Sequence, residues 1–349
     1  MFDHLDKGRW WDVGLQLVEG CTKVSPGCDN CWSLTAANMR RFNPNPKTAA
    51  RYAGAVQYSQ SKPIVTDTVS HYTGPPQWTG RVNPQWADLD KIGRSRTPKV
   101  YTFWNDLFHP GVPEEFIDGV LHRIQKNYPH FYIICTKRPE RARDMFIRGC
   151  VSPDAVHAWN LMIMTTAENQ EMADLRIPAL LQIPGVLHGV SVEPGLSAVS
   201  LRWLGKIKEG LNTEYDGLRK FDWVICGGET GPHARPMHPD IPRKLRDQCQ
   251  AAGVPFFFKA WGEWAPVAPI YDNTSAYADG QFDDRIAAAI EKRCQIVDLN
   301  GHLWPEFQPP PGSWMVEKVG KKASGRLLDG RTWDEVPLIP ETYNLEPGT

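Results

Sequence analysis

Short apolar runs recur along the chain, and a polar loop follows each of them. Most of these runs are apolar at nearly every position, which is typical of strands that are buried on both faces of a parallel sheet. The runs are Trp11–Val18, Val100–Trp104, Phe131–Cys135, Leu161–Thr165, Val186–Val192, Trp223–Cys226 and Val254–Phe258. The pattern therefore predicts a parallel sheet built from these segments.

Helical patterns fill the intervals between the runs. Pro113–Tyr128 carries apolar residues at helical spacing and two glutamates in its first turn, where negative charge favours a helix N-terminus. Ile241–Ala252 is followed by Gly253, a residue type that commonly ends helices. The alternation of β and α elements, roughly every 25–35 residues, predicts an α/β fold of the (β/α) TIM-type barrel, full or partial.

Two regions break this alternation. Residues 40–98 are rich in Pro, Gly, Gln and Arg and are predicted to be an insertion after the first βα unit. Residues 265–349 contain short strand-like runs at Gln295–Leu299 and Trp314–Val319 and are predicted to be a C-terminal extension that packs on the barrel as a cap. We therefore expect a barrel domain over residues 1–264, with the insertion inside it, followed by this extension.

Composition and charge narrow the class of protein. The 349 residues are 41% apolar, enough for a sizeable core, and the net charge of −1 excludes a chain that is basic overall. The first residues are polar and no run of 18 apolar residues occurs, so neither a signal peptide nor a membrane span is expected. Five of the eight cysteines are scattered singly, which is typical of reduced thiols in a cytoplasmic protein.

The other three cysteines, Cys21, Cys28 and Cys31, lie together after the first apolar run. Three thiolates on one short loop can hold a metal ion or an iron–sulfur cluster, and a missing fourth ligand leaves a position open for a substrate or cofactor. A structural zinc site is the alternative, with a histidine or a distant cysteine as the fourth ligand. Either site needs a tight turn, which Ser25–Gly27 predict.

Polar residues follow every later run, where a βα barrel places its catalytic groups. The candidate binding residues are Asn105, Asp106, Lys137, Arg138, Glu168, Asn169, Glu193, Gly227, Gly228 and Glu229, with His109, Lys259 and Glu263 beside them. If the barrel is correct, these groups converge with the cysteines on one mouth. Structural roles are the alternatives: a helix cap at Asp106 and His109, a solvated helix start at Lys137 and Arg138, and a simple turn at Gly227 and Gly228.

Several motifs of the chain resemble a phage and bacterial family of uncharacterised proteins that is commonly grouped with radical S-adenosylmethionine (SAM) enzymes. They are the cysteine segment, Asn-Asp-Leu-Phe-His, Thr-Lys-Arg-Pro-Glu-Arg, Ser-Val-Glu-Pro, Gly-Gly-Glu-Thr-Gly-Pro-His-Ala-Arg-Pro and Phe-Phe-Lys-Ala-Trp-Gly-Glu-Trp. The likeness runs from about Trp11 to Trp264 and resumes at Glu317–Asp334. The cysteine spacing is Cys-x6-Cys-x2-Cys, whereas radical SAM enzymes usually have Cys-x3-Cys-x2-Cys.

The resemblance implies a cofactor pair and a chemistry. Radical SAM enzymes hold a [4Fe–4S] cluster with three cysteines, here Cys21, Cys28 and Cys31, and the methionine moiety of SAM chelates the fourth iron. An external electron donor reduces the cluster, SAM is cleaved to a 5′-deoxyadenosyl radical, and the radical abstracts a substrate hydrogen. If the protein is phage-encoded, its location is the host cytoplasm.

The resemblance also implies roles for the residues at the strand ends. By this likeness, Asn105 and Asp106 meet the SAM amino group. The candidates that meet the ribose and the carboxylate of SAM are Glu168, Asn169 and Glu193. The glycines beside the adenine of SAM are Gly227 and Gly228. The cations that could pair with the SAM carboxylate are Lys137 and Arg138. Glu229 is a further candidate from the sixth strand end.

We expect the substrate to be a nucleobase in phage DNA, which the enzyme would modify or hypermodify. Basic residues in the insertion and the tail can meet phosphates: Arg40, Arg41, Arg94, Arg96, Lys318, Lys321, Lys322 and Arg326. A solvated surface is the structural alternative for these charges. The functional alternatives are a zinc-stapled, non-catalytic nucleic-acid-binding protein and a radical SAM enzyme that acts on a peptide or a small metabolite. Isomerase, transferase and lyase reactions stay open.

Overall fold

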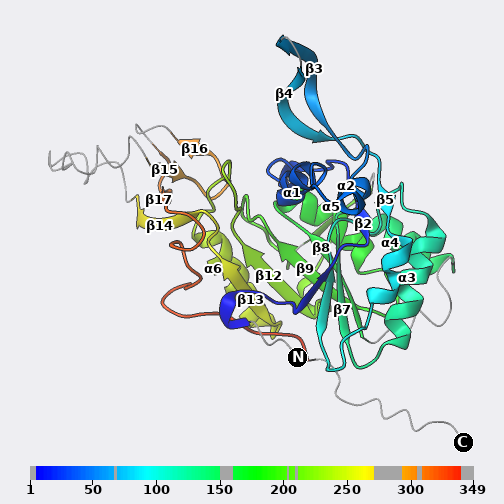
Figure 1. Cartoon of the computed structure of the whole chain (residues 1–349). Coiled ribbons are helices and arrows are strands. Elements are labelled where there is room, and N and C mark those ends of the chain that lie inside the picture. The colour runs from blue at the N-terminus through cyan, green and yellow to red at the C-terminus, as the bar shows by residue number, and fades with distance from the viewer. Residues whose placement is uncertain are drawn as a thin grey trace, which may run out of the picture.

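A seven-stranded parallel sheet forms the centre of the protein in the computed structural model (Figure 1). The structure describes residues 5–66, 69–149, 160–202, 204–208, 211–270, 293–304 and 309–338. The strands of the sheet are β1 (Val13–Leu15), β6 (Val100–Phe103), β7 (Phe131–Thr136), β8 (Leu161–Thr166), β9 (Leu187–Val192), β12 (Trp223–Gly227) and β13 (Phe256–Ala260). Each predicted run overlaps one of these strands, and β7, β8, β12 and β13 extend one or two residues past the predicted end.

The strands lie side by side in the order in which they follow along the chain, β1-β6-β7-β8-β9-β12-β13, and all neighbours are parallel. The sheet curls into a half-barrel (Figure 1). The expected mixed α/β class is therefore confirmed, and the curl is compatible with a partial (β/α) barrel. Within the described strands β1 and β13 are the two edges, so the half-barrel is open between them.

Helices cover one face of the sheet. The six α-helices of the described residues are α1 (Trp32–Arg40), α2 (Pro46–Arg51), α3 (Glu114–Lys126), α4 (Pro139–Ile147), α5 (Gln170–Leu180) and α6 (Asp240–Ala252). Helices α3 to α6 bury apolar residues against the same side of the strands, in one large core cluster. The helix expected at Pro113–Tyr128 is confirmed, as is Gly253 at the end of α6, where its φ of 70° suits glycine.

The other face of the sheet has a smaller core. Phe131, Met162, Trp223 and Phe257 pack there with Trp10 from the segment that precedes β1. The tail reaches this core as well, since the Trp223 indole donates a hydrogen bond to the Glu335 carbonyl at 2.8 Å. Burial on both faces explains why the strands are apolar at nearly every position.

The region predicted as an insertion forms elements of its own. It contains α2, the hairpin of β3 (Val56–Thr66) and β4 (Val69–Trp78), the short strand β5 (Asn83–Pro84) and a 3₁₀ helix, Trp86–Lys91. The hairpin projects from the body of the protein (Figure 1). The first apolar run is divided, because β1 ends at Leu15 and the separate strand β2 (Val18–Glu19) pairs with β5.

A second, antiparallel sheet follows the half-barrel. Its strands are β14 (Trp264–Pro269), β15 (Cys294–Val297), β16 (Leu303–Trp304) and β17 (Trp314–Lys318), in the order β14-β17-β15-β16. The two strands expected in the tail are thus confirmed. The division of the chain at residues 264 and 265 stays a prediction, and residues 271–292, 305–308 and 339–349 of the extension lie outside the described residues. A hairpin of β10 (Leu204–Lys208) and β11 (Leu211–Tyr215) precedes β12.

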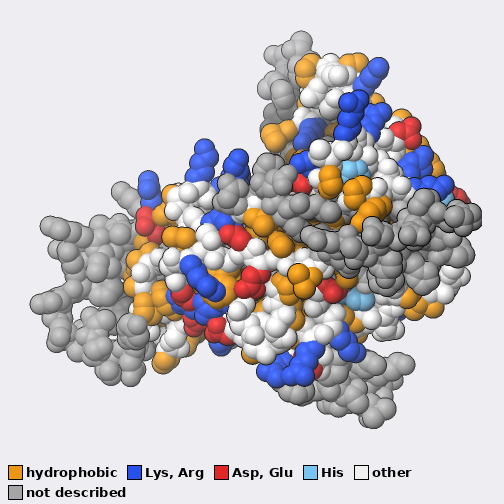
Figure 2. All heavy atoms as spheres, turned by 90° about the horizontal axis from the view of Figure 1, so that it is seen from below, with side chains coloured by type: hydrophobic (Ala, Val, Ile, Leu, Met, Phe, Trp, Pro, Cys, Tyr) orange, Lys and Arg blue, Asp and Glu red, His pale blue; other side chains and the backbone are white. Residues whose placement is uncertain are grey.

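The surface carries both signs of charge. On the face that Figure 2 shows, Lys and Arg side chains form several separate groups with Asp and Glu among them. In the described part of the chain, no helix has the length and apolar character that crossing a membrane requires.

Candidate functional site

The cysteines lie on residues 20–31, between β2 and α1, and this segment is called the cysteine loop below. Cys21, Cys28 and Cys31 are all free thiols and all half-buried. A short 3₁₀ helix, Pro26–Cys28, forms the predicted turn, and the Cys28 amide donates to the Ser25 carbonyl at 2.9 Å. Cys31 is the N-cap residue of α1, and its side chain makes no capping hydrogen bond. Three thiols thus lie on one short, ordered segment.

Glu168, which follows β8, fastens the middle of this loop. Its carboxylate accepts a hydrogen bond from the Gly27 amide at 3.0 Å, and it pairs with Arg176 of α5 at 2.9 Å. Both members of the pair are almost fully buried. Burial raises the pKa of Glu168, but Arg176 and the hydrogen bonds from the loop outweigh it, so the pKa is lowered and the carboxylate is ionised at neutral pH.

Glu229, which follows β12, fastens the end of the loop. Asn30 donates its side-chain amide to Glu229 Oε2 at 2.9 Å, and Arg235 pairs with Oε1 at 2.6 Å. The same Arg235 donates to the Pro26 carbonyl at 2.8 Å and lies 3.4 Å from the Asp29 carboxylate. One acid and one guanidinium therefore bind three positions of the loop.

Arg138, which follows β7, fastens the start of the loop. It pairs with Asp106 at 2.6 Å and donates to the Thr22 hydroxyl at 2.5 Å. His109 lies on the other side of that hydroxyl, with Nε2 3.0 Å from Thr22 Oγ1. Because His109 Nδ1 accepts from the Gly111 amide at 3.0 Å, the ring proton belongs on Nε2.

The protonation states at this end of the loop follow from burial. Burial, and then the charge of Arg138, lower the pKa of His109 to about 4, so its ring is neutral at pH 7. Burial raises the pKa of the Cys21 thiol to about 11, and Asp106 adds to the rise while Arg138 opposes it. A thiol with that pKa is protonated at neutral pH, so a metal that binds Cys21 has to displace a proton.

Asn105, which follows β6, joins the strand before the loop to the helix after it. Its side-chain amide donates to the Val18 carbonyl at 2.6 Å, and its oxygen accepts a hydrogen bond from the Ser33 hydroxyl. The backbone of Asn105 has a φ of 63°, a conformation that asparagine tolerates better than most residues. Three strand ends, those of β7, β8 and β12, thus hold the loop, and the end of β6 joins the two elements that flank it.

The remaining predicted residues lie elsewhere at the strand ends. Glu193 pairs with Lys259 at 2.8 Å, joining the ends of β9 and β13, and Gly227 lies beside them, where a Cβ would stand 2.9 Å from Glu193 Oε1. Asn169 accepts from the Met172 amide and caps α5. The ammonium group of Lys137 makes no ion pair within the described residues.

Gly228 has a packing role that the sequence did not reveal. A Cβ at this position would stand 1.9 Å from the Trp261 carbonyl oxygen, so the backbones after β12 and β13 approach closely here. This close backbone contact explains why residue 228 is glycine, and the explanation requires no bound ligand.

Replacing Gly228 by alanine is expected to destabilise the protein by about 1–3 kcal/mol, because a backbone has to move to admit the methyl group. Gly119 is the matched control, because it lies inside α3 and a Cβ there would make ordinary contacts of 3.6 Å or more. Gly119→Ala should stabilise by about 0.5–1 kcal/mol through helix propensity. Urea unfolding of the two variants measures both effects, and a shift of the same sign in both would contradict this account.

The structure brings together half of the candidate binding residues around the cysteine loop: Asn105, Asp106, Arg138, Glu168 and Glu229. Thr22, Asn30 and Arg176 were not predicted. A signal for Arg176 exists, because it occupies an apolar-face position of α5, four residues after Met172 and four before Leu180. Thr22 and Asn30 carry no such signal.

Among the described residues, no three His, Cys, Asp or Glu side chains come together closely enough to hold one metal ion. The charge of Cys31 contributes to the raised pKa of Cys21, so these two thiols lie within electrostatic reach of each other.

Fold and site together define a mixed α/β protein whose curled parallel sheet holds a three-cysteine loop at the carboxyl ends of its strands. The chain belongs to a family of proteins of unknown function, DUF5131, whose profile matches residues 6–337. No curated protein and no solved structure matches the chain.

Proposed function

We propose that the protein is a radical SAM enzyme that holds a [4Fe–4S] cluster with Cys21, Cys28 and Cys31. The observation that carries the proposal is the cysteine loop, because three free, half-buried thiols lie on a segment that side chains from three strand ends hold and a fourth flanks. A loop fixed in this way presents three thiolates and no fourth, which leaves one iron open to a cofactor. The half-barrel is then a partial (β/α) barrel of the radical SAM type, with the second sheet as its cap.

The polar strand ends divide into two groups in this proposal. Asp106, Arg138, Glu168 and Glu229 are positioning residues, because Arg138, Glu168 and Glu229 bind the cysteine loop and Asp106 pairs with Arg138. Lys137 and the Glu193–Lys259 pair are left to meet SAM. An ammonium group can bind the SAM carboxylate, and the Glu193 carboxylate can accept hydrogen bonds from ribose hydroxyls.

Cys21, Cys28 and Cys31 would hold the cluster, which would supply the electron for reductive cleavage of SAM. The chain excludes water from part of the site, as Asp106, His109, Glu168 and Glu229 are all buried. The Thr22 hydroxyl accepts from both Arg138 and His109, which leaves its own proton for an acceptor at the loop. The proposed substrate is a nucleobase of DNA, whose phosphates the basic residues of the insertion would meet.

The test is SAM cleavage by anaerobically purified protein that has been reconstituted with iron and sulfide and reduced with dithionite. We expect brown protein that converts SAM to 5′-deoxyadenosine and methionine, measured by liquid chromatography. Colourless protein with one zinc per chain, or iron-loaded protein that leaves SAM intact, would overturn the proposal. Omission of dithionite is the control, because cleavage must require the electron.

A further inference from the structure

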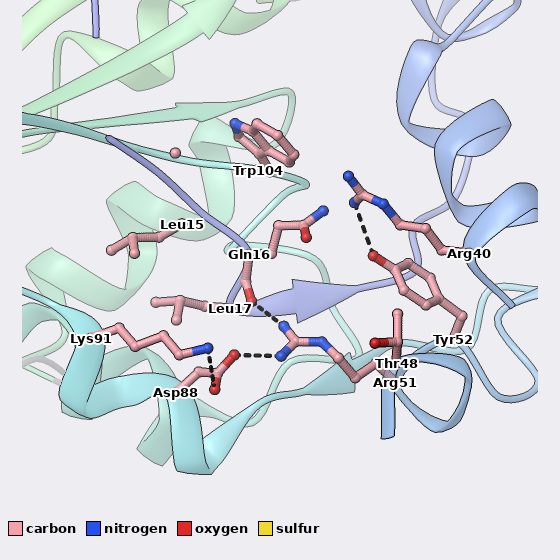
Figure 3. A pocket seen from close by; sticks show the side chains of 11 residues that line it. Leu15, Gln16, Leu17, Arg40, Thr48, Arg51, Tyr52, Asp88, Lys91 and Trp104 are labelled. Carbon is pink, nitrogen blue, oxygen red and sulfur yellow. Dashed lines mark hydrogen bonds and ion pairs between the residues drawn. The ribbon is translucent and has the colours of Figure 1, made fainter. Parts of the chain in front are cut away.

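A pocket of about 460 Å³ lies between β1, an edge strand of the large sheet, and residues of the predicted insertion (Figure 3). Its walls come from the end of β1, from α1 and α2, and from the 3₁₀ helix Trp86–Lys91. The lining residues that matter here are Leu15, Gln16, Leu17, Arg40, Tyr52 and Trp104. The volume is within the range that small-molecule sites have, about 300–1,000 Å³.

One wall of the pocket is an indole. Trp104 follows β6, and its ring rests on β1 at Gly14, where a Cβ would stand 2.5 Å from the indole nitrogen. The indole can pack directly on β1 because Gly14 has no side chain. Leu15 and Leu17 supply apolar surface, and the side chains of Gln16, Arg40 and Trp104 point toward one another (Figure 3). A ligand with a flat aromatic ring and polar atoms at the edge of that ring could pack on the indole and bind the polar side chains.

The cations of the pocket are not equivalent. Arg51 pairs with Asp88 at 2.5 Å and with Glu19 at 3.1 Å, and Lys91 pairs with Asp88 at 2.8 Å, so both cations already have carboxylate partners. Arg40 makes no ion pair within the described residues; it donates to the Tyr52 hydroxyl at 3.1 Å and lies 5.7 Å from the centre of the Trp104 ring. Arg40 is thus the guanidinium available to an anion.

The surrounding segment is basic. Residues 32–86 contain six Lys and Arg (Arg40, Arg41, Lys47, Arg51, Lys62 and Arg81) but a single acid, Asp67, in a chain whose net charge is −1. A local excess of five positive charges attracts an anion to this side of the protein. An aromatic wall and a free guanidinium in a basic segment select a ligand with a flat ring and a phosphate.

We propose that this pocket binds a nucleoside phosphate unit, with the base against Trp104 and the phosphate at Arg40. The pocket adjoins the cysteine loop, because the Trp104 ring meets the ring of Trp32, the residue after Cys31, edge to face at 5.3 Å. As a substrate site the pocket depends on the proposed function, but the binding itself requires neither cluster nor SAM. The unit can come from a free nucleotide or from an unpaired nucleotide of a DNA strand.

The experiment is isothermal titration calorimetry of the full chain without cluster or SAM. The probes are the four deoxynucleoside monophosphates, the matching nucleosides, inorganic phosphate and a single-stranded 12-mer. We expect at least one monophosphate to bind with one site per chain, about tenfold or more tightly than its nucleoside or phosphate alone. Binding of phosphate as tightly as of every nucleotide would overturn the proposal, as would no binding of any nucleotide or strand.

Substitutions of residues that line the pocket test whether the nucleotide binds there. Arg40→Gln and Trp104→Leu should each weaken nucleotide binding about tenfold or more, and Trp104→Phe should keep most of it because a ring remains. The matched control is Arg148→Gln, an exposed arginine at the end of α4. Since Arg40 is a half-exposed side chain, its variant tests the proposal even if Trp104→Leu fails to fold. Unchanged binding in the Arg40→Gln protein, or equal loss in the control, would overturn the assignment.

The probes also separate the two sources. Tighter binding of the strand, in competition with the monophosphate, identifies a nucleotide of DNA, whereas monophosphate binding without strand binding identifies a free nucleotide; both support the pocket. The proposed function can fail independently, because lack of SAM cleavage leaves the calorimetric result standing.

Discussion

Replacing Cys28 by alanine is expected to reduce the iron of anaerobically reconstituted protein from about four atoms per chain to fewer than one. Two thiolates cannot hold the proposed cluster in place of three. The change should leave the loop folded, because the Cys28 backbone keeps its hydrogen bond to Ser25 and the thiol's own contact is a 3.9 Å approach to the Ser25 hydroxyl. Iron analysis and the visible absorption of the cluster measure the loss.

Cys294→Ala is the matched control for this variant. Cys294 is also a free, half-buried thiol, but it begins β15 in the second sheet. It should retain iron at the level of the unaltered protein, and both variants should unfold at similar urea concentrations. Iron retained by Cys28→Ala would refute the ligand assignment, and equal loss in both proteins would show that the iron is not held by the cysteine loop.

Replacing Arg176 by methionine is expected to destabilise the protein by about 3–5 kcal/mol, because Glu168 is left as a buried charge without its partner. The two side chains are 2% and 0% exposed and 2.9 Å apart, so water cannot take over the role of the guanidinium. Methionine has a similar length and no charge, which limits the cavity term. Urea or guanidinium unfolding at pH 7 measures the change.

Two further variants show whether the lost stability comes from the unpaired carboxylate. Glu168→Gln combined with Arg176→Met removes both charges and should recover part of the loss. Arg123→Met breaks an exposed pair with Asp90 and should cost about 0–1 kcal/mol. Losses of the same size in Arg176→Met and Arg123→Met would contradict the argument from burial.

The strands of the large sheet could be predicted because a strand that is buried on both faces is apolar at nearly every position, and this pattern can be seen within one segment. β7 and β8 are buried at nearly every position, and no knowledge of neighbours is needed to see that pattern. The β3–β4 hairpin could not be predicted in the same way. Its strands contain Pro63, Gly74, Pro75 and Pro76, which are unfavourable in a sheet interior but are tolerated where a two-stranded ribbon stands apart.

The site was predictable in position but not in its contacts. Parallel strands present their carboxyl ends on one edge, so polar residues at those ends had to lie near the cysteine loop. Which residue contacts which loop position depends on how the sheet curls. The Gly27–Glu168 and Asn30–Glu229 bonds join residues 141 and 199 positions apart, and no local pattern encodes such a choice.

These same separations have a consequence for how the protein is made. The ribosome synthesises Glu229 199 residues after Asn30, which takes about 10–40 s at roughly 5–20 residues per second. Until then the nascent chain lacks the carboxylate that holds Asn30 at the end of the cysteine loop. If the loop holds the proposed cluster, we therefore expect the cluster to be delivered only after Glu229 has been synthesised.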